Sequence, residues 1–420
     1  MSTFTAVRRR LRGTFYGWWL VTGAIGIQIL QSGLMLQAFG IYVPIWREEF
    51  GWSKTALATV FSLQRLESGL LGPLQGWLLR HFGARTIMQV GLVVFGLGLL
   101  ALSQVESLVT FTLAYLILAA GATLGGFLSL MTVIVNWFER KRSIALALMQ
   151  VGGSIGGLLI PLLAWSLITH GWRTTAAISG LIVLLAGLPL SLLMRNRPED
   201  YGQLPDGRQK PSGRATEAAG PLDGSQDFST GQALRTPAFW LLSLGHALAV
   251  TLVSAVTVHL VIHLDEALTF SLQRSAFVVA FLTSITLVGQ LLGGFLGDRM
   301  DKRIIASMAM LGHAGGVLVL AWAGSLVTVL LFAALHGLAW GVRGPLMGAL
   351  RADYFGRTSF ATIMGFSGII IMTGSMSGPI LAGYLADHFG SYRPAFTLLA
   401  ALAGLGAIIF LFVRRPKLRP

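Results

Sequence analysis

The sequence predicts an all-α membrane protein in which twelve transmembrane helices form two pseudo-symmetric six-helix bundles. Of its 420 residues, 54% are hydrophobic and 11% are charged, whereas a soluble protein has about 25% charged residues. Twelve apolar stretches have roughly the 20 residues that a helix needs to cross the hydrocarbon of a bilayer. The second stretch of each half also aligns with its counterpart without gaps. These observations argue against a soluble globular fold.

The twelve stretches fall into two sets of six. The first set covers 16–44, 55–79, 86–104, 108–135, 144–168 and 174–194, and the second covers 237–264, 276–296, 304–323, 326–350, 361–385 and 394–413. The segment between them, from Arg195 to Arg235, is rich in Pro, Gly, Asp and Arg, a composition typical of a flexible linker. We therefore expect an N-terminal bundle over 1–195, a linker over 196–234 and a C-terminal bundle over 235–420.

The basic residues are unevenly distributed between the two sides of the membrane. With a cytoplasmic N-terminus, 24 of the 31 Lys and Arg residues are cytoplasmic, Arg351 after the tenth stretch among them, and five are external. This excess places both termini in the cytoplasm. It also accounts for the net charge of +14 without a nucleic-acid partner. The basic arm Arg8-Arg9-Arg10 leads directly into the first stretch without a cleavage site, and short loops and the absence of Cys are compatible with a bacterial inner membrane.

An internal repeat relates the two halves. Residues 53–76 match residues 271–294 at an offset of 218, and each copy is followed by a loop of one type. A related run over 383–390 closes the eleventh stretch on the opposite side of the membrane. Inverted repeats nested within six-helix halves would produce this pattern. Around the tenth stretch the offset is 217, so Arg343 corresponds to Gly126 in the fourth.

Over essentially its whole length the chain resembles the major facilitator superfamily. The loop motif of that family, Gly-x-Leu-x-Asp-Arg-x-Gly-x-Arg, is present in parts after the second helix of each half. The matching residues are Gly76, Gly83 and Arg85 in the first copy and Asp298, Arg299 and Arg303 in the second. In the family the acid helps to hold the two halves together in the outward-open state. Arg80 replaces it in the first copy, so the resemblance assigns that role to Asp298 alone.

Within the superfamily the chain is similar to the branch of monocarboxylate transporters and oxalate/formate antiporters. The segments behind this similarity are Phe15-Tyr-Gly-Trp-Trp19, Glu49-Phe-Gly-Trp-Ser53, Asn136-Trp-Phe-Glu-Arg-Lys-Arg142 and Asp353-Tyr-Phe-Gly-Arg357. The resemblance implies that helices one, four, seven and ten line a central cavity. The branch often has a basic residue in helix one or eight, but here helix one has only glutamines and helix eight only Gln290 with Thr and Ser.

Ionisable residues inside the apolar stretches are the candidate functional residues, because hydrocarbon excludes charge. We expect Arg343 and Arg65 to bind substrate, since a guanidinium can hold a carboxylate bidentately, and Gln31 to line the same cavity. Snorkelling is the alternative for Arg343 and helix packing the alternative for Gln31. Glu67 and His336 are candidate proton-coupling groups. Glu67 could instead be a neutral or paired structural carboxyl, and His336 a neutral histidine hydrogen-bonded to a neighbouring helix.

These residues predict a secondary active transporter for a small organic anion, a mono- or dicarboxylate, coupled to protons or to a counter-substrate. One alternative is proton-coupled efflux of amphipathic drugs or metabolites with Glu67 at its centre. A second is a transport-silent membrane sensor. No nucleophile–base constellation, metal cluster or ATP motif indicates an enzyme, a metal site or a cofactor. The expected partners are the organic anion, protons or a counter-substrate and the lipid bilayer, and we expect a monomer.

Overall fold

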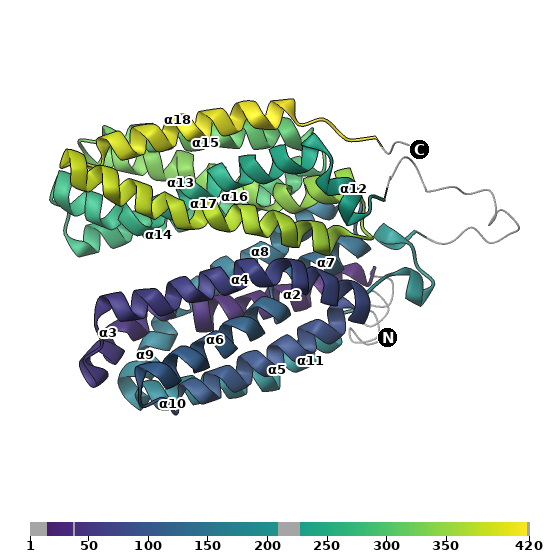
Figure 1. The fold of residues 1–420 in the computed structure, drawn as a ribbon, viewed down its shortest axis with the longest axis horizontal. Coiled ribbons are helices and arrows are strands. Elements are labelled where there is room, and N and C mark those ends of the chain that lie inside the picture. Colours follow the sequence, from purple (N-terminus) through teal and green to yellow (C-terminus); the bar gives the residue numbers. More distant parts are fainter. Residues whose placement is uncertain (1–14, 37, 209–226, 418–420) are drawn as a thin grey trace, which may run out of the picture. The chain divides into compact units, whose positions relative to one another are not determined.

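A computed structural model of the chain describes residues 15–36, 38–208 and 227–417. The regular structure of these residues is helical, which confirms the predicted all-α class (Figure 1). The basic arm at Arg8-Arg9-Arg10 lies outside the described residues. By their contacts the residues group into two compact units, 1–45 with 82–222 and 46–81 with 223–420. The predicted domain boundaries at 195 and 235 remain a prediction.

The first unit holds the helices of the N-terminal half except the second. They are α2 (Gly17–Gln31), η1 (Ser32–Leu36), α3 (Phe39–Phe50) as far as residue 45, α5 (Ala84–Leu102), α6 (Leu108–Gly125), α7 (Phe127–Trp137), α8 (Arg142–Leu158), α9 (Ile160–His170), α10 (Trp172–Ile182), η2 (Val183–Gly187), α11 (Leu188–Leu192) and the short turns η3 (Glu199–Tyr201) and η4 (Pro205–Gly207).

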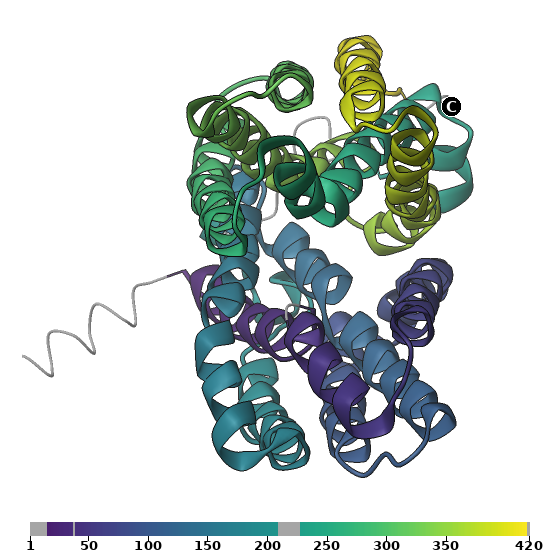
Figure 2. The same cartoon turned by 90° about the vertical axis from the view of Figure 1, so that its left-hand side faces the viewer.

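The second unit holds α4 together with the helices of the C-terminal half. They are α4 (Lys54–Phe82), α12 (Thr230–Leu234), α13 (Pro237–Leu268), α14 (Leu272–Gly297), α15 (Lys302–Ala321), α16 (Leu326–Phe355), α17 (Phe360–Phe389) and α18 (Arg393–Phe412). Figure 1 shows the six long helices α13–α18 running lengthwise, and the view turned by 90° looks along several of them (Figure 2).

Eleven helical spans in the described residues are long and apolar enough to cross a membrane. The helix α4 has 29 residues but is not among the eleven, since polar residues such as Gln64, Arg65, Glu67 and Gln75 lower its hydropathy. With α4 included, the spans correspond one to one to the twelve predicted stretches. Many large apolar side chains are uncovered by protein, for example Ile168 at 85% exposure. Lipid is the solvent that suits such a surface, and the chain is a multi-pass membrane protein.

In the second unit, α16 is held between α14 and α15, while α17 packs on α13 and α18 on α15. Glycine makes the contact between α14 and α16 very close. A Cβ atom built on Gly341 of α16 would lie 2.1 Å from the carbonyl oxygen of Thr286, and one on Gly293 of α14 would lie 2.3 Å from that of Val342. Small residues allow helix backbones to approach in this way. The helix that carries Arg343 is thereby fixed against its neighbour.

Candidate functional site

The guanidinium of Arg343 is buried inside the second unit. Its side chain is 2% exposed, and neither Nε nor Nη1 has a hydrogen-bond partner among the residues that the structure describes. Such burial disagrees with snorkelling, which would bring the charge to the interface. Because an unpaired buried charge is costly, this geometry favours a site that is completed by an anion.

A second arginine of α16 is buried close by, contrary to the sequence analysis. Arg351 was expected in a cytoplasmic loop after residue 350, but α16 continues to Phe355 and Arg351 is 1% exposed. Its Nη2 donates to Ser367 Oγ of α17 at 2.7 Å and its Nη1 to the Met347 carbonyl at 2.8 Å. Ser367 in turn shares a 2.9 Å hydrogen bond with Ser243 of α13. Arg351 therefore joins three helices.

The candidate proton-coupling residue His336 is paired with a histidine that sequence reasoning did not single out. Nδ1 of His336 lies 3.1 Å from Nδ1 of His313 on α15, and both rings are fully buried. One ring must donate and the other accept, so the two rings differ in protonation at Nδ1. Neither Nε2 has a partner among the described residues. The signal available in the sequence was that the stretches 304–323 and 326–350 each contain a single His.

Five basic side chains of α13, α15 and α16 form a cluster. We define the basic cluster as His246, His313, His336, Arg343 and Arg351. The charge of Arg343 acts on each of the other four, and that of Arg351 also acts on His246. Nδ1 of His246 is buried without a partner in the described part of the chain. An excess of positive charge in a low-dielectric interior attracts anions.

The helix α4 carries the other two predicted charges. Arg65 is exposed, and its guanidinium carbon lies 5.2 Å from the centre of the Phe61 ring. Glu67 is half-buried, and its Oε2 is a buried atom with no hydrogen-bond partner among the described residues. The two side chains thus differ in environment, as expected for residues two apart on a helix. The substrate-binding role of Arg65 and the proton-coupling role of Glu67 stay predictions.

The side-chain amide of Gln31 forms a hydrogen bond within the first unit. It is 8% exposed, and its Nε2 donates to the Ala122 carbonyl at 3.2 Å. This contact lies beside a break in the fourth span, where Gly126 has non-helical dihedral angles between α6 and α7. A Cβ atom on Gly126 would lie 2.4 Å from Gln31 Oε1. The contact favours the packing alternative, and the substrate-binding role of Gln31 remains a prediction.

The first copy of the loop motif is explained by close backbone contacts. Gly76 packs so tightly that a Cβ atom would lie 2.5 Å from Cα of Thr362 on α17. Gly83 precedes α5 with a φ of 80°, a conformation that favours glycine, and a Cβ there would lie 2.3 Å from Asn196 Nδ2. The backbone N–H of Arg85 donates to Oδ1 of the same Asn196 at 2.9 Å.

The second copy of the motif lies between α14 and α15. Asp298 is half-buried and follows the last residue of α14. Arg299 donates from Nη1 to the Phe295 carbonyl at 3.0 Å. Arg303 donates from Nε to Asp301 at 3.1 Å and from Nη1 to the Val413 carbonyl at 2.9 Å. The conformational role of these residues is not tested by this geometry.

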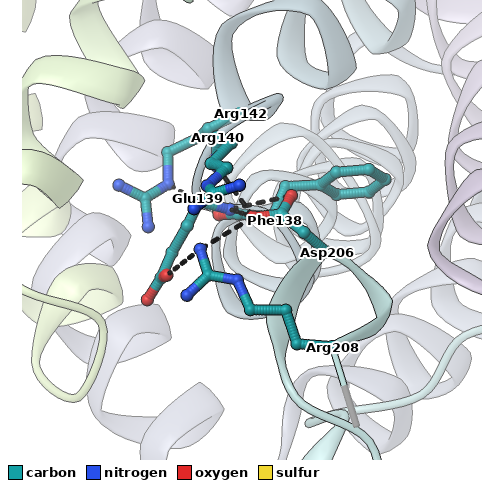
Figure 3. A network of polar contacts seen from close by, with 6 residues as sticks. All are labelled: Phe138, Glu139, Arg140, Arg142, Asp206 and Arg208. Atoms are coloured by element: carbon teal, nitrogen blue, oxygen red, sulfur yellow. Dashed lines mark hydrogen bonds and ion pairs between the residues drawn. The ribbon is translucent and has the colours of Figure 1, made fainter. Parts of the chain in front are cut away.

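Both described ends of the predicted linker are anchored by an aspartate. Figure 3 shows Asp206 accepting a hydrogen bond from the backbone N–H of Arg140 at 2.9 Å. Next to it, Arg208 and Glu139 form an ion pair at 3.4 Å, and Arg142 Nε donates to the Phe138 carbonyl at 2.9 Å. In the second unit Asp227 accepts the N–H of Arg357 at 2.8 Å. Arg140 and Arg357 are equivalent at the repeat offset of 217, so the two aspartates of the linker bind equivalent positions of the repeat.

Comparison with known proteins decides the family. The model of the Major Facilitator Superfamily matches residues 25–324 and 242–420. The chain belongs to this superfamily. It is 25% identical over 294 residues to the hexuronate transporter of Escherichia coli strain K12, which covers 67% of each chain. It is 37% identical over 146 residues to mouse monocarboxylate transporter 6, covering 33% of this chain and 30% of that one.

Solved structures agree with the assignment. The superfamily transporter FucP in its outward conformation has a TM-score of 0.72 at 15% identity, covering 94% of this chain and 99% of that one. This likeness confirms the fold. The family and its relatives identify the chain as a secondary transporter, not an enzyme, and confirm the resemblance to a superfamily that includes monocarboxylate transporters.

Proposed function

We propose that this chain transports a small organic anion, a mono- or dicarboxylate, and that Arg343 binds the carboxylate. The observation that carries the proposal is the buried guanidinium with Nε and Nη1 unpartnered in the described residues. A carboxylate could accept two parallel hydrogen bonds from this group and neutralise its charge. The names of two relatives, a hexuronate transporter and a monocarboxylate transporter, belong to the same chemical class.

The mechanism that we infer is alternating access driven by a proton gradient or by exchange. Glu67 or His336 is the candidate coupling group, and Arg65 is a second candidate for the anion. We place the protein as a monomer in a bacterial inner membrane with both termini cytoplasmic, since the positive-inside rule favours that orientation. Asp298 is our candidate for the acid that holds the outward-open state.

Binding can be tested by thermal unfolding of the purified chain with millimolar mono- and dicarboxylates. A ligand at 100 times its Kd adds about 2.7 kcal/mol to the free energy of unfolding. We expect one carboxylate class to stabilise the wild type, Arg343→Lys to retain part of the effect and Arg343→Gln to lose it. Arg274→Gln, which removes an exposed charge from the start of α14, is the matched control and should respond like the wild type.

Flux into proteoliposomes separates transport from its alternatives. The proposal would be supported if the liposomes take up the stabilising carboxylate and if this uptake requires an imposed pH gradient or carboxylate inside the liposomes. Binding without flux would instead support a sensor. The efflux alternative rests on the buried Oε2 of Glu67, which has no hydrogen-bond partner in the described part of the chain. Stabilisation by lipophilic amines and not by any carboxylate, abolished by Glu67→Gln, would replace our proposal with this alternative.

A further inference from the structure

A polar cavity of about 370 Å³ lies in the second unit, and none of the five residues of the basic cluster lines it. It is lined by the start of α15, the last turn of α16 and the residues that follow α18. Figure 1 shows the chain leaving α18 at the end of the unit where α12 also lies. The charged lining residues are Asp301, Lys302, Arg303, Asp353, Arg414 and Arg415. The transport proposal assigns no role to this cavity.

The cavity has an excess of positive charge, with four cations and two carboxylates. The carboxylates are engaged, because Lys302 Nζ lies 2.8 Å from Asp353 Oδ2 and Arg303 is paired with Asp301. Arg414 is exposed. It follows Val413, whose carbonyl accepts a 2.9 Å hydrogen bond from Arg303. This bond ties the segment after α18 to α15, so that the cations face one space. A phosphate group, with several charged acceptor oxygens, is the chemistry that such a set of donors fits.

The surface beside the cavity favours a lipid as the source of the phosphate. On α15 the exposed apolar residues Ile304, Met308 and Leu311 lie on one face, since they are spaced by four and three residues. Leu405, Ile408 and Phe412 do the same on α18, and all six are 47–67% exposed. The two helices are in contact, with Ser307 Oγ donating to the Ala407 carbonyl at 2.9 Å. Both apolar faces are therefore available to acyl chains whose headgroup occupies the cavity.

We propose that this cavity binds the phosphate of an anionic phospholipid, whose acyl chains lie along α15 and α18. Clusters of Lys and Arg at the end of a transmembrane helix attract anionic lipids, and each cation contributes about a fivefold increase in affinity. A volume of about 370 Å³ accommodates roughly twelve waters at about 30 Å³ each, and hence a phosphate with its glycerol.

The test is a titration of the purified full-length chain with phosphatidylglycerol in mixed micelles, read by thermal unfolding. We expect phosphatidylglycerol to raise the unfolding temperature, and we expect phosphatidylcholine and millimolar inorganic phosphate to leave it unchanged. In Arg414→Gln/Arg415→Gln the half-saturating lipid concentration should rise about 25-fold, a factor of about five for each arginine. The matched control Arg80→Gln/Arg140→Gln removes two exposed charges, one from the last turn of α4 and one from the loop after α7, and should titrate like the wild type.

Three results would overturn the proposal. The first is an unchanged half-saturating concentration in the Arg414/Arg415 double variant. The second is an equal response to phosphatidylcholine, which would mean that the headgroup charge is not recognised. The third is the same stabilisation by inorganic phosphate, which would make the cavity a site for a soluble anion. Both arginines are exposed, and the unfolding temperature of the double variant without lipid is the reference for its own titration.

Discussion

The contact between α14 and α16 allows one substitution to be predicted in detail. A Cβ atom on Gly341 would lie 2.1 Å from the carbonyl oxygen of Thr286 and 2.7 Å from the backbone nitrogen of Gln290. Both neighbours are backbone atoms, so no side chain can rotate away. Contacts of Cβ atoms below 3.0 Å essentially do not occur, so Gly341→Ala must part the two helices by the 0.9 Å between 2.1 and 3.0 Å.

Overpacking of this kind costs about 1–3 kcal/mol. The unfolding temperature should fall by about 2–4 °C for each kcal/mol, as measured by scanning fluorimetry of the detergent-solubilised chain. Gly315→Ala on α15 is the matched control because nothing lies within 4 Å of its Cβ position. Alanine favours a helix over glycine by up to about 1 kcal/mol, so this control should be as stable as the wild type or more stable.

The same substitution should weaken ligand binding, because Arg343 lies two residues from Gly341 on the displaced helix. A carboxylate that stabilises the wild type should therefore stabilise Gly341→Ala less than it stabilises Gly315→Ala. The reasoning would be refuted by a Gly341→Ala variant that unfolds at or above the temperature of Gly315→Ala. That result would mean that α14 and α16 do not approach as closely as the structure has them.

Three further substitutions have defined outcomes. Ser367→Ala removes the hydroxyl acceptor of Arg351 and should cost about 1.5–3 kcal/mol in the free energy of unfolding, since hydrogen bonds to charged groups have this value. Asp227→Ala removes the acceptor at the start of the second unit and should cost about 1 kcal/mol, measured by urea unfolding. The hydrogen bond from Arg303 lowers the pKa of Asp301 from its ordinary 3.8, so the stabilisation is complete above that value and is lost as the pH falls through the lowered pKa. Asp301→Asn should remove this acid-dependent loss from a series of melting curves between pH 6 and pH 2.

Two control substitutions accompany these three. Ser284→Ala removes an exposed hydroxyl that bonds only within its own helix and should leave the stability unchanged. Asp387→Ala removes an exposed carboxylate and should have no measurable effect at neutral pH. An equal loss in Ser367→Ala and Ser284→Ala would show that the bond to Arg351 adds nothing. A pH dependence that persists in Asp301→Asn would assign the acid sensitivity to other carboxylates.

The transmembrane spans could be predicted from sequence because hydrocarbon imposes a length and a composition on each of them. The end of α16 could not. Hydropathy ended the tenth stretch at Leu350, before a charge, whereas the helix continues through the buried Arg351 to Phe355. The buried guanidinium of Arg351 donates to Ser367, which lies 16 residues further along the chain and on another helix. A one-dimensional window contains no information about such a partner.

The candidate site was predictable to a similar degree. Arg343 was identified because a charge deep in an apolar stretch requires an explanation, and its burial agrees with that reasoning. His313 was not singled out, since its importance arises from the 3.1 Å contact with His336 across two helices. Gln31 was chosen by residue type alone. Its amide is already used by the Ala122 carbonyl, which becomes accessible only because the fourth span breaks at Gly126.

The break at Gly126 shows how the two halves of the repeat have diverged. At the equivalent position the C-terminal half has Arg343, within a helix of 30 uninterrupted residues. At this repeat position the N-terminal half therefore has a helix break, whereas the C-terminal half has an intact helix and a buried cation. The two halves therefore differ in backbone and in charge at this position, and one cannot replace the other. A chimera assembled from two N-terminal halves would have two broken spans and no arginine at either position, and we expect it to insert in a membrane without acquiring an anion site.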